Sequence, residues 1–248
     1  MITVKGIVLK ERNVGENGKF IDILTAENGI IELSVRGARK INSRFLSSTQ
    51  LFAYSDFCYH ESGGYRVLNS CEPIRIFYNL RNSLSKISLA CYMAEVLRFC
   101  AEPQPDNDIL RLFLNTLHFL EKDLRDEKML KAIFELRLMA EIGFMPDVVM
   151  CRECGAYEPA ELYFSIREGC FCCADCFKFN PDEWNRINIS VLSAMRHILL
   201  TDFDRLFNFR TSENTMNMLA YISEKYLTAK LERGFKTLDF YKSIKQTI

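Results

Sequence analysis

Two closely spaced pairs of cysteines are the residues in this sequence most suited to a specific chemistry. Cys151 and Cys154 form one C-x-x-C pair, and Cys173 and Cys176 form a second pair after an 18-residue gap. Each pair makes a turn on which two thiolates converge, and two such pairs at this separation are typical of a four-thiolate zinc site. The spacing predicts one zinc ion, held by these four cysteines.

Two further cysteines leave the choice of ligands open. Cys170 also forms a C-x-x-C pair with Cys173, after a 15-residue gap, and Cys172 lies between them. We predict that Cys173 pairs with Cys176, which leaves Cys170 and Cys172 as spare thiols or as rival ligands.

A site with four thiolates has no position left for a water molecule, so its zinc ion is expected to be structural. The three histidines, His60, His118 and His197, lie far from the cysteines in sequence. The sequence also lacks the G-x-x-x-x-G-K-[ST] phosphate-binding loop and the G-x-S-x-G nucleophile elbow. We therefore predict no enzymatic activity, with a zinc-dependent hydrolase as the alternative that an open metal site would favour.

A second chemical feature is a stretch of uncompensated positive charge near the N-terminus. No carboxylate occurs between Glu32 and Asp56, and the stretch carries four basic residues. Such a loop, joined to strands, can bind nucleic-acid phosphates and release their counterions. With three basic residues that precede it, the predicted nucleic-acid-binding set is Lys10, Arg12, Lys19, Arg36, Arg39, Lys40 and Arg44.

Aromatic residues accompany this basic stretch on the predicted strands. They are Phe52, Tyr54, Phe57, Tyr59 and Tyr65. Most aromatic side chains on a small barrel belong to its core, but an exposed subset could stack on unpaired bases.

The elements that must position these residues change type along the chain. Ile31, Leu33 and Val35 alternate with polar residues, which indicates a half-buried strand, and Asn28-Gly29 before them is typical of a tight hairpin. Residues 3–9, 19–25, 31–35, 51–60 and 65–69 are predicted as five short strands. They favour a small barrel, either an OB-fold or an SH3-like barrel.

Beyond Pro73 the apolar residues recur every three or four positions, which indicates amphipathic helices. Helices are predicted over about 80–94, 109–120, 127–140, 191–198 and 212–234, with a break at 102–105 after the first. The overall prediction is an α+β fold, with an N-terminal barrel domain at residues 1–78 and a helical domain at 79–248. The helical domain carries the zinc-binding insert at about 147–180.

Composition limits the classes of protein that fit. Hydrophobic residues make up 48% of the chain, which is enough for a sizeable core. The 32 basic residues balance the 32 acidic ones, so any nucleic-acid binding must come from a local basic face. The sequence has no signal-peptide core and no apolar run of about 20 residues, so we expect a cytoplasmic protein without membrane contact.

The order of these features resembles the RecO family of bacterial recombination mediators from end to end. The resemblance is most specific at Phe134-Glu135-Leu136-Arg137-Leu138, Gly143-Phe144-Met145-Pro146 and Cys151-x-x-Cys154-Gly155. It extends to Lys5-Gly6-Ile7-Val8-Leu9, Val35-Arg36-Gly37-Ala38-Arg39-Lys40, Phe164-Ser165, Tyr226, Lys236 and Phe240. The chain departs from the family pattern at Gly169-Cys170 and at the Gly18-Lys19 turn.

The resemblance implies an N-terminal OB-fold and a helical domain with a zinc module. It also implies binding to single- and double-stranded DNA, annealing of complementary strands, and partnership with RecR in loading RecA onto DNA covered by single-strand-binding protein. A nucleoid-associated location follows from such a role. Arg233 and Lys236 are candidate contacts for the acidic tail of the single-strand-binding protein, although basic residues near helix ends also complement the helix dipole. The second alternative is a zinc-bearing adaptor that contacts only proteins, which the balanced charge favours.

Overall fold

The structure, a computed structural model, describes residues 1–100, 107–180 and 183–247. The predicted helix break at 102–105 lies outside these residues. The chain forms two compact units, one of Met1–Lys122 with Phe235–Ile248 and one of Asp123–Gly234. The predicted domains, residues 1–78 and 79–248, divide the chain differently and stay a prediction.

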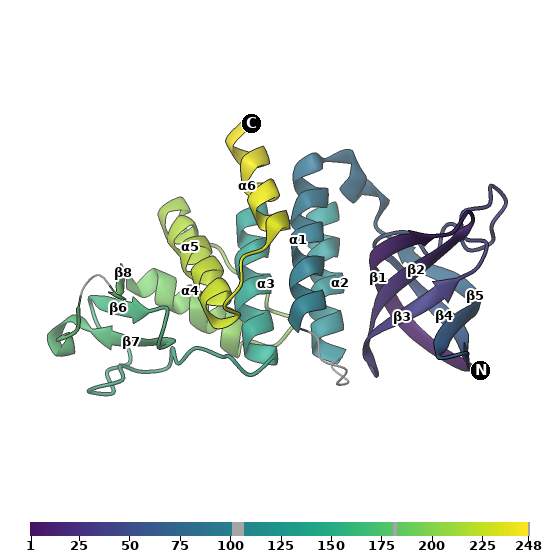
Figure 1. The fold of residues 1–248 in the computed structure, drawn as a ribbon. Helices are drawn as coiled ribbons and strands as arrows, with labels where there is room; N and C mark the ends of the chain where they lie inside the picture. Colours follow the sequence, from purple (N-terminus) through teal and green to yellow (C-terminus); the bar gives the residue numbers. More distant parts are fainter. Residues whose placement is uncertain (101–106, 181–182, 248) are drawn as a thin grey trace. The chain divides into compact units, whose positions relative to one another are not determined.

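The first unit begins with a closed barrel of five strands (Figure 1). The strands are β1 (Ile2–Val14), β2 (Gly18–Thr25), β3 (Gly29–Val35), β4 (Ala53–Ser62) and β5 (Tyr65–Ile76). Their order is β1-β2-β3-β5-β4, and the barrel closes where β1 pairs antiparallel with β4. A parallel bridge between Ser34 and Val67 joins β3 to β5. The predicted OB-fold barrel and the α+β class are confirmed.

Alternation along the strands builds the barrel core. On β3, Ile31, Leu33 and Val35 are buried while Glu32 between them is exposed, as the period-two pattern predicts. Ile21 and Ile23 of β2 face the same interior, as does Phe57 of β4. On β2 this alternation places Phe20 and Asp22 on the outer face.

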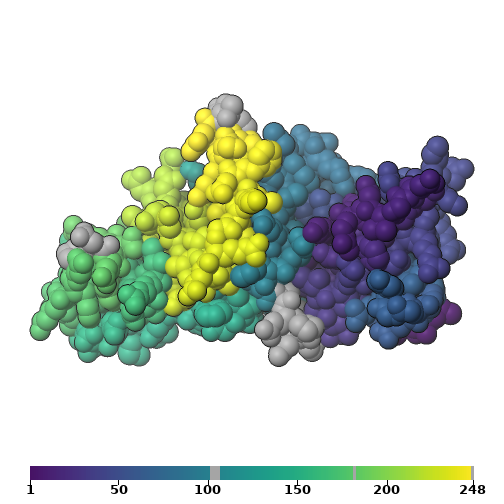
Figure 2. Space-filling model, viewed as in Figure 1, coloured from purple at the N-terminus to yellow at the C-terminus, as the bar shows by residue number. Residues whose placement is uncertain are grey.

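Helices complete the first unit. A short 3₁₀ turn, η1 (Tyr78–Asn82), leads into α1 (Leu84–Cys100), and α2 (Asn107–Glu121) follows. The C-terminal helix α6 (Lys236–Thr247), which the sequence analysis missed, packs closely against α1 (Figure 2). Phe235 places its ring edge-on to Tyr92, and Glu95 of α1 accepts hydrogen bonds from the amide and hydroxyl of Thr237.

The second unit combines three helices with a small sheet. The helices are α3 (Glu127–Glu141), α4 (Ile189–Leu200) and α5 (Glu213–Lys230), which begin after the N-cap residues Asp126, Asn188 and Ser212. The sheet has the order β7-β6-β8, formed by β6 (Leu162–Ser165), β7 (Cys170–Cys173) and β8 (Asn185–Ile187). A 3₁₀ turn, η2 (Ala174–Cys176), follows β7 directly. None of the helices described, in either unit, is long and apolar enough to cross a membrane.

Candidate metal centre and nucleic-acid interface

The four predicted zinc ligands lie together in the second unit. The sulfur atoms of Cys151, Cys154, Cys173 and Cys176 all lie within 4.8 Å of one another. Cys151 and Cys173 are buried, whereas Cys154 is exposed at the surface. Among the residues that the structure describes, Cys170 and Cys172 do not belong to this group. The chain therefore has a four-cysteine cluster that could hold a metal ion.

Local backbone geometry brings each pair of sulfurs together. Gly155 has a φ of +75°, which an L side chain rarely adopts, and its amide donates to the Cys151 carbonyl at 2.9 Å. The second pair stands at the end of β7, where η2 turns the chain between Cys173 and Cys176. The Cys173 amide donates to the Cys151 sulfur at 3.3 Å, which links the two turns.

The cluster fits a tetrahedral metal site in its spacing. Zinc–sulfur bonds of about 2.3 Å place tetrahedral sulfur ligands about 3.8 Å apart. The sulfurs of Cys154 and Cys173 lie 3.7 Å apart. Sulfur ligands alone, in a closed set of four, suit zinc or an iron–sulfur centre better than a hard cation.

Crowding of the sulfur atoms affects the acid–base properties of Cys151, Cys173 and Cys176. Burial works against ionisation of Cys151, but hydrogen bonds from the backbone outweigh it and lower the pKa of this thiol to about 6. Hydrogen bonds with the neighbouring thiols of Cys173 and Cys154 raise the pKa of Cys176, and burial raises that of Cys173. Metal binding requires thiol ligands to lose their protons, so a bound cation would favour the ionised form of such a group.

Two residues fasten the cysteine-rich segment to the helices of its unit, and the first of them, Arg196, was not predicted from the sequence. Buried Arg196 of α4 donates to the carbonyl oxygens of Val148 and Tyr157 at 2.7 and 2.6 Å. Tyr226 of α5 donates to the Phe144 carbonyl at 2.9 Å. The sequence signal for Arg196 is its position four residues after Leu192, which places it on the apolar face of a predicted helix.

The predicted nucleic-acid-binding residues all belong to the first unit, but they occupy different environments. Arg36, Arg39 and Lys40 are exposed, and within the described part of the chain their side chains form no hydrogen bond or ion pair. The loop that carries them is folded by turns, because the Lys40 amide donates to the Gly37 carbonyl and the Arg39 amide to Asn17. Arg44 donates to the Asn69 carbonyl at 2.6 Å and lies over the ring of Phe45.

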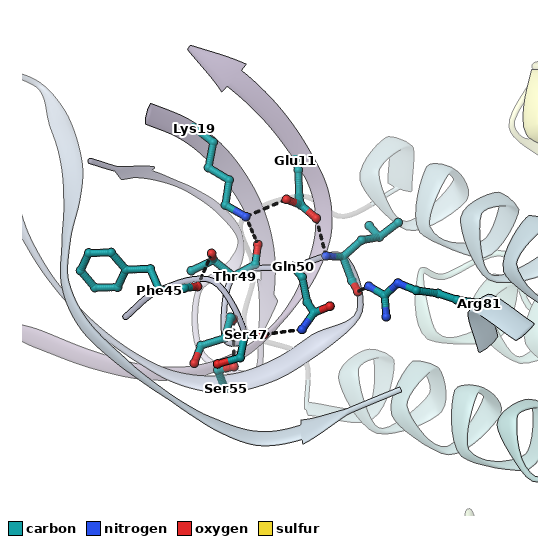
Figure 3. Close-up of polar contacts among 10 residues, drawn as sticks. Glu11, Lys19, Phe45, Ser47, Thr49, Gln50, Ser55 and Arg81 are labelled. Atoms are coloured by element: carbon teal, nitrogen blue, oxygen red, sulfur yellow. Dashed lines mark hydrogen bonds and ion pairs between the residues drawn. The ribbon is translucent and has the colours of Figure 1, made fainter. Parts of the chain in front are cut away.

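Lys19 lies inside the end of the barrel (Figure 3). Its ammonium group donates to the Glu11 carboxylate at 2.7 Å and to the Thr49 carbonyl at 2.6 Å. The other oxygen of Glu11 accepts from the Leu51 amide, and Arg81 donates to the Leu51 carbonyl. These bonds hold the end of the basic loop against the barrel.

The remaining predicted residues lie on strands or near helix ends. Arg12 is on β1, where it pairs with Glu32 at 3.0 Å. Lys10 is exposed on β1 and lines a hollow that also contains Lys236, the first residue of α6. Arg233 is exposed in the turn after α5. Lys236 and Arg233 belong to different compact units.

Of the aromatic candidates, Phe52, Phe57 and Tyr59 are buried in the first unit. Tyr65 is 58% exposed, and it is the member of this set that a base could reach most easily. The ring centre of Phe20, which was not among the predicted aromatic candidates, lies 6.0 Å from that of Tyr65.

Comparison with known proteins gives a consistent assignment. The family model described as "Recombination protein O N terminal" matches residues 1–77, and "Recombination protein O C terminal" matches residues 81–239. The chain is 32% identical to the "DNA repair protein RecO" of Acetivibrio thermocellus over 98% of this chain and 97% of that protein. It is 29% identical to the protein of the same name from Alkaliphilus metalliredigens, over 98% and 100% of the two chains.

A closed five-stranded barrel, followed by helices and a cluster of four cysteines that could hold a metal ion, defines a class of α+β proteins. Within this class the chain belongs to the RecO family, because the two family models together span nearly its whole length. Its role is in DNA repair and recombination, and the family is one of repair mediators, not of enzymes.

Proposed function

We propose that this protein binds single- and double-stranded DNA and anneals complementary strands during repair by homologous recombination. The observation that carries the proposal is the match to the RecO family in both the barrel and the helical region. The charge distribution supports it, since Arg36, Arg39 and Lys40 are exposed cations without carboxylate partners among the described residues. Such cations gain free energy by displacing counterions from phosphates.

In this proposal the basic loop and the adjacent strand β1 follow the phosphate backbone. Arg36, Arg39 and Lys40 make direct phosphate contacts, with Lys10, Arg12 and Arg44 at the margins. Lys19 contributes from the barrel interior, because its ammonium group holds the loop end in place. Annealing follows when the charges of two strands are neutralised while their base edges remain free to pair.

We further propose that the four cysteines hold one structural zinc ion. The sulfur distances and the closed set of four ligands support this assignment. The ion stabilises a segment that has only two short paired strands and η2 between residues 162 and 176.

The proposed partners follow from family membership. They are RecR, the acidic tail of the single-strand-binding protein and, indirectly, RecA. Exposed Arg233 and Lys236 are candidate contacts for that tail. A protein with this role works in the cytoplasm, associated with the nucleoid.

Strand annealing tests the proposal. Two complementary oligonucleotides, one carrying a fluorophore and one a quencher, are mixed with and without single-strand-binding protein. The proposal predicts that this protein accelerates quenching of both naked and coated strands, and that RecR changes the rate on coated strands. An Arg36→Gln/Arg39→Gln/Lys40→Gln variant should anneal naked strands more slowly than the wild type.

An unchanged annealing rate at every protein concentration would contradict the proposal. If the protein also bound single-strand-binding protein without touching DNA, the adaptor alternative would replace it.

A further inference from the structure

The basic loop, residues 36–52 between β3 and β4, carries at its apex an apolar side chain that does not contribute to the core. Ile41 is 95% exposed, whereas the other large apolar side chains in the described residues, apart from Met1, are at most 59% exposed. The loop projects beyond the strand ends of the barrel (Figure 1). This isoleucine is therefore available to a binding partner.

The projecting part of the loop is held at both ends and closed by a turn. Ala38 and Phe45 pack into the barrel core, where they are 1% and 9% exposed. Between them, the Ser43 amide donates to the Lys40 carbonyl at 2.9 Å, which closes a β-turn with Ile41 at its first central position. The backbone therefore presents the isoleucine in a defined position.

The charges beside Ile41 indicate what covers it. Arg39 and Lys40, the two residues before it, are exposed, and no carboxylate occurs between Glu32 and Asp56. This concentration of positive charge favours a polyanion. An anionic membrane fits less well, because even one whole fatty acyl chain holds a protein to a bilayer only marginally, and an isoleucine buries less.

Duplex DNA offers an apolar interior between lines of phosphates. Isoleucine is among the side chains that DNA-binding proteins insert between neighbouring base pairs, which unstacks the bases and bends the duplex. Basic residues next to such a side chain contact the phosphates on either side. The cost of unstacking is least where the bases are mismatched, so insertion discriminates between duplexes of equal charge.

We propose that Ile41 inserts between neighbouring bases of duplex DNA while Arg39 and Lys40 contact the phosphates beside it. The inference rests on the proposed DNA binding and adds a selective element to it. The cations alone bind equally to any two duplexes with the same number of phosphates. The isoleucine gives the protein a preference for a duplex whose bases separate at little cost, such as one with a mismatch.

The test compares two labelled duplexes of equal length, one fully paired and one with a single central mismatch. Their dissociation constants are measured by fluorescence anisotropy for the wild type and Ile41→Ser. We expect the wild type to bind the mismatched duplex more tightly. Ile41→Ser should weaken this binding by about tenfold, the effect of losing the burial of one isoleucine, and should no longer distinguish the two duplexes.

The controls separate insertion from charge and from folding. Ile41→Leu keeps an apolar side chain and should keep the preference, whereas Lys40→Gln should weaken binding to both duplexes by the same factor. Ile74→Ser removes another exposed isoleucine, 47% accessible, from β5 and should leave both affinities unchanged. Ile41→Ser should unfold at the same urea concentration as the wild type.

Unstacking has its own signal. The fluorescence of 2-aminopurine placed beside the mismatch should rise when the wild type binds and should not change when Ile41→Ser binds. Equal wild-type affinity for the two duplexes, or a preference that survives Ile41→Ser, would overturn the insertion and leave phosphate binding standing.

Two other outcomes identify a different partner or a wider failure. Loss of binding to phosphatidylglycerol vesicles in Ile41→Ser, with DNA affinities unchanged, would overturn the insertion in favour of a membrane contact. If the wild type bound neither duplex in dilute buffer, the proposed DNA binding itself would fail, together with the inference that rests on it.

Discussion

Lys19 shows how a basic residue in a DNA-repair protein can serve the fold. It stands between Gly18 and Phe20 on β2, with its side chain on the inner face that Ile21 and Ile23 also occupy. A buried ammonium group is costly unless its hydrogen bonds are satisfied. Glu11 and the Thr49 carbonyl satisfy it here, and through them the lysine joins β1, β2 and the end of the basic loop.

Replacing this lysine should therefore destabilise the first unit. We expect Lys19→Met to lower its free energy of unfolding by roughly 2 kcal/mol, because the Glu11 carboxylate and the Thr49 carbonyl lose their partner. The measurement is urea unfolding, with exposed Lys40→Met as the matched control. The control should change the free energy by less than about 0.5 kcal/mol. Equal stability of the two variants would show that the buried network contributes nothing.

A second residue-scale prediction concerns Gly169, which has a φ of +72°. A Cβ atom there would lie 2.8 Å from the hydroxyl oxygen of Tyr226, which is held by the Phe144 carbonyl. Gly169→Ala should cost about 2–4 kcal/mol, from the left-handed backbone and from the clash. Gly143→Ala, at φ +87° with nothing within 4 Å, should cost only about 1–2 kcal/mol.

Removal of the Tyr226 hydroxyl checks the cause of this difference. Tyr226→Phe should recover part of the stability lost in Gly169→Ala, as measured by thermal unfolding of the double variant. If the added methyl group does not meet the Tyr226 hydroxyl, the double variant will recover none of the lost stability.

At the scale of elements, the basic residues and the cysteines lie on two loops, and a few contacts hold each loop in place. The basic loop between β3 and β4 is held at its end by Lys19, Glu11 and Arg81. The cysteine turns are joined by the bond from the Cys173 amide to the Cys151 sulfur. In both places the basic residues or the cysteines lie on turns, and the neighbouring strands and helices hold these turns in position.

For the basic loop, we predict that removing two of its cations makes DNA binding less dependent on salt. Arg39→Gln/Lys40→Gln should weaken single-strand binding and reduce the slope of log K against log salt by about 1.4, which corresponds to two lost phosphate contacts. The slope is obtained from titrations at several salt concentrations. Lys242→Gln/Lys245→Gln removes the same charge from exposed positions of α6 and should leave the slope unchanged. Equal slopes for the two double variants would show that the loop does not contact phosphates.

For the cysteine turns, we predict one zinc ion per chain. Cys154→Ser should lose zinc and lower the unfolding temperature of the second unit. Cys170→Ser should retain the zinc ion and the wild-type unfolding temperature. Metal content by atomic spectrometry and thermal unfolding provide the measurements. A cobalt-substituted protein should show the spectrum of four sulfur ligands, and a spectrum with nitrogen or oxygen ligands would favour the open site of a hydrolase.

Sequence patterns predicted the elements that have a strong period or a fixed spacing. The alternation of apolar and polar residues on β3 was sufficient to predict the barrel. The 3.6-residue period of apolar residues was sufficient to predict most of the helices. The C-x-x-C spacing was sufficient for the four-sulfur cluster, which the structure places within 4.8 Å. The RecO resemblance, seen in motifs from both ends of the chain, is confirmed by the family comparisons.

Other features were not predictable because they depend on contacts between distant segments. The three-residue strand β8 is too short to show a period, and its pairing partner is more than 20 residues away. The sequence does not predict α6, because Gly234 is typical of a helix end and the last predicted helix stops there. The burial of Lys19 depends on Thr49, which is 30 residues away. Phe20 lies near Tyr65 only because β2 pairs with β3 and β3 pairs with β5.

At the scale of the whole molecule, positive charge is local and the net charge is zero. A neutral protein gains little long-range attraction to DNA, so the proposed DNA binding would depend on the exposed cations of the basic loop. The four-cysteine cluster belongs to the other compact unit. Metal removal is therefore expected to destabilise the second unit, whereas the first unit retains its own core.

The most direct measurement is the affinity of the purified wild-type protein for unpaired DNA between low and physiological salt. The account predicts binding in dilute buffer that weakens steadily as salt rises. A protein that left unpaired DNA unbound even at the lowest salt would contradict the account.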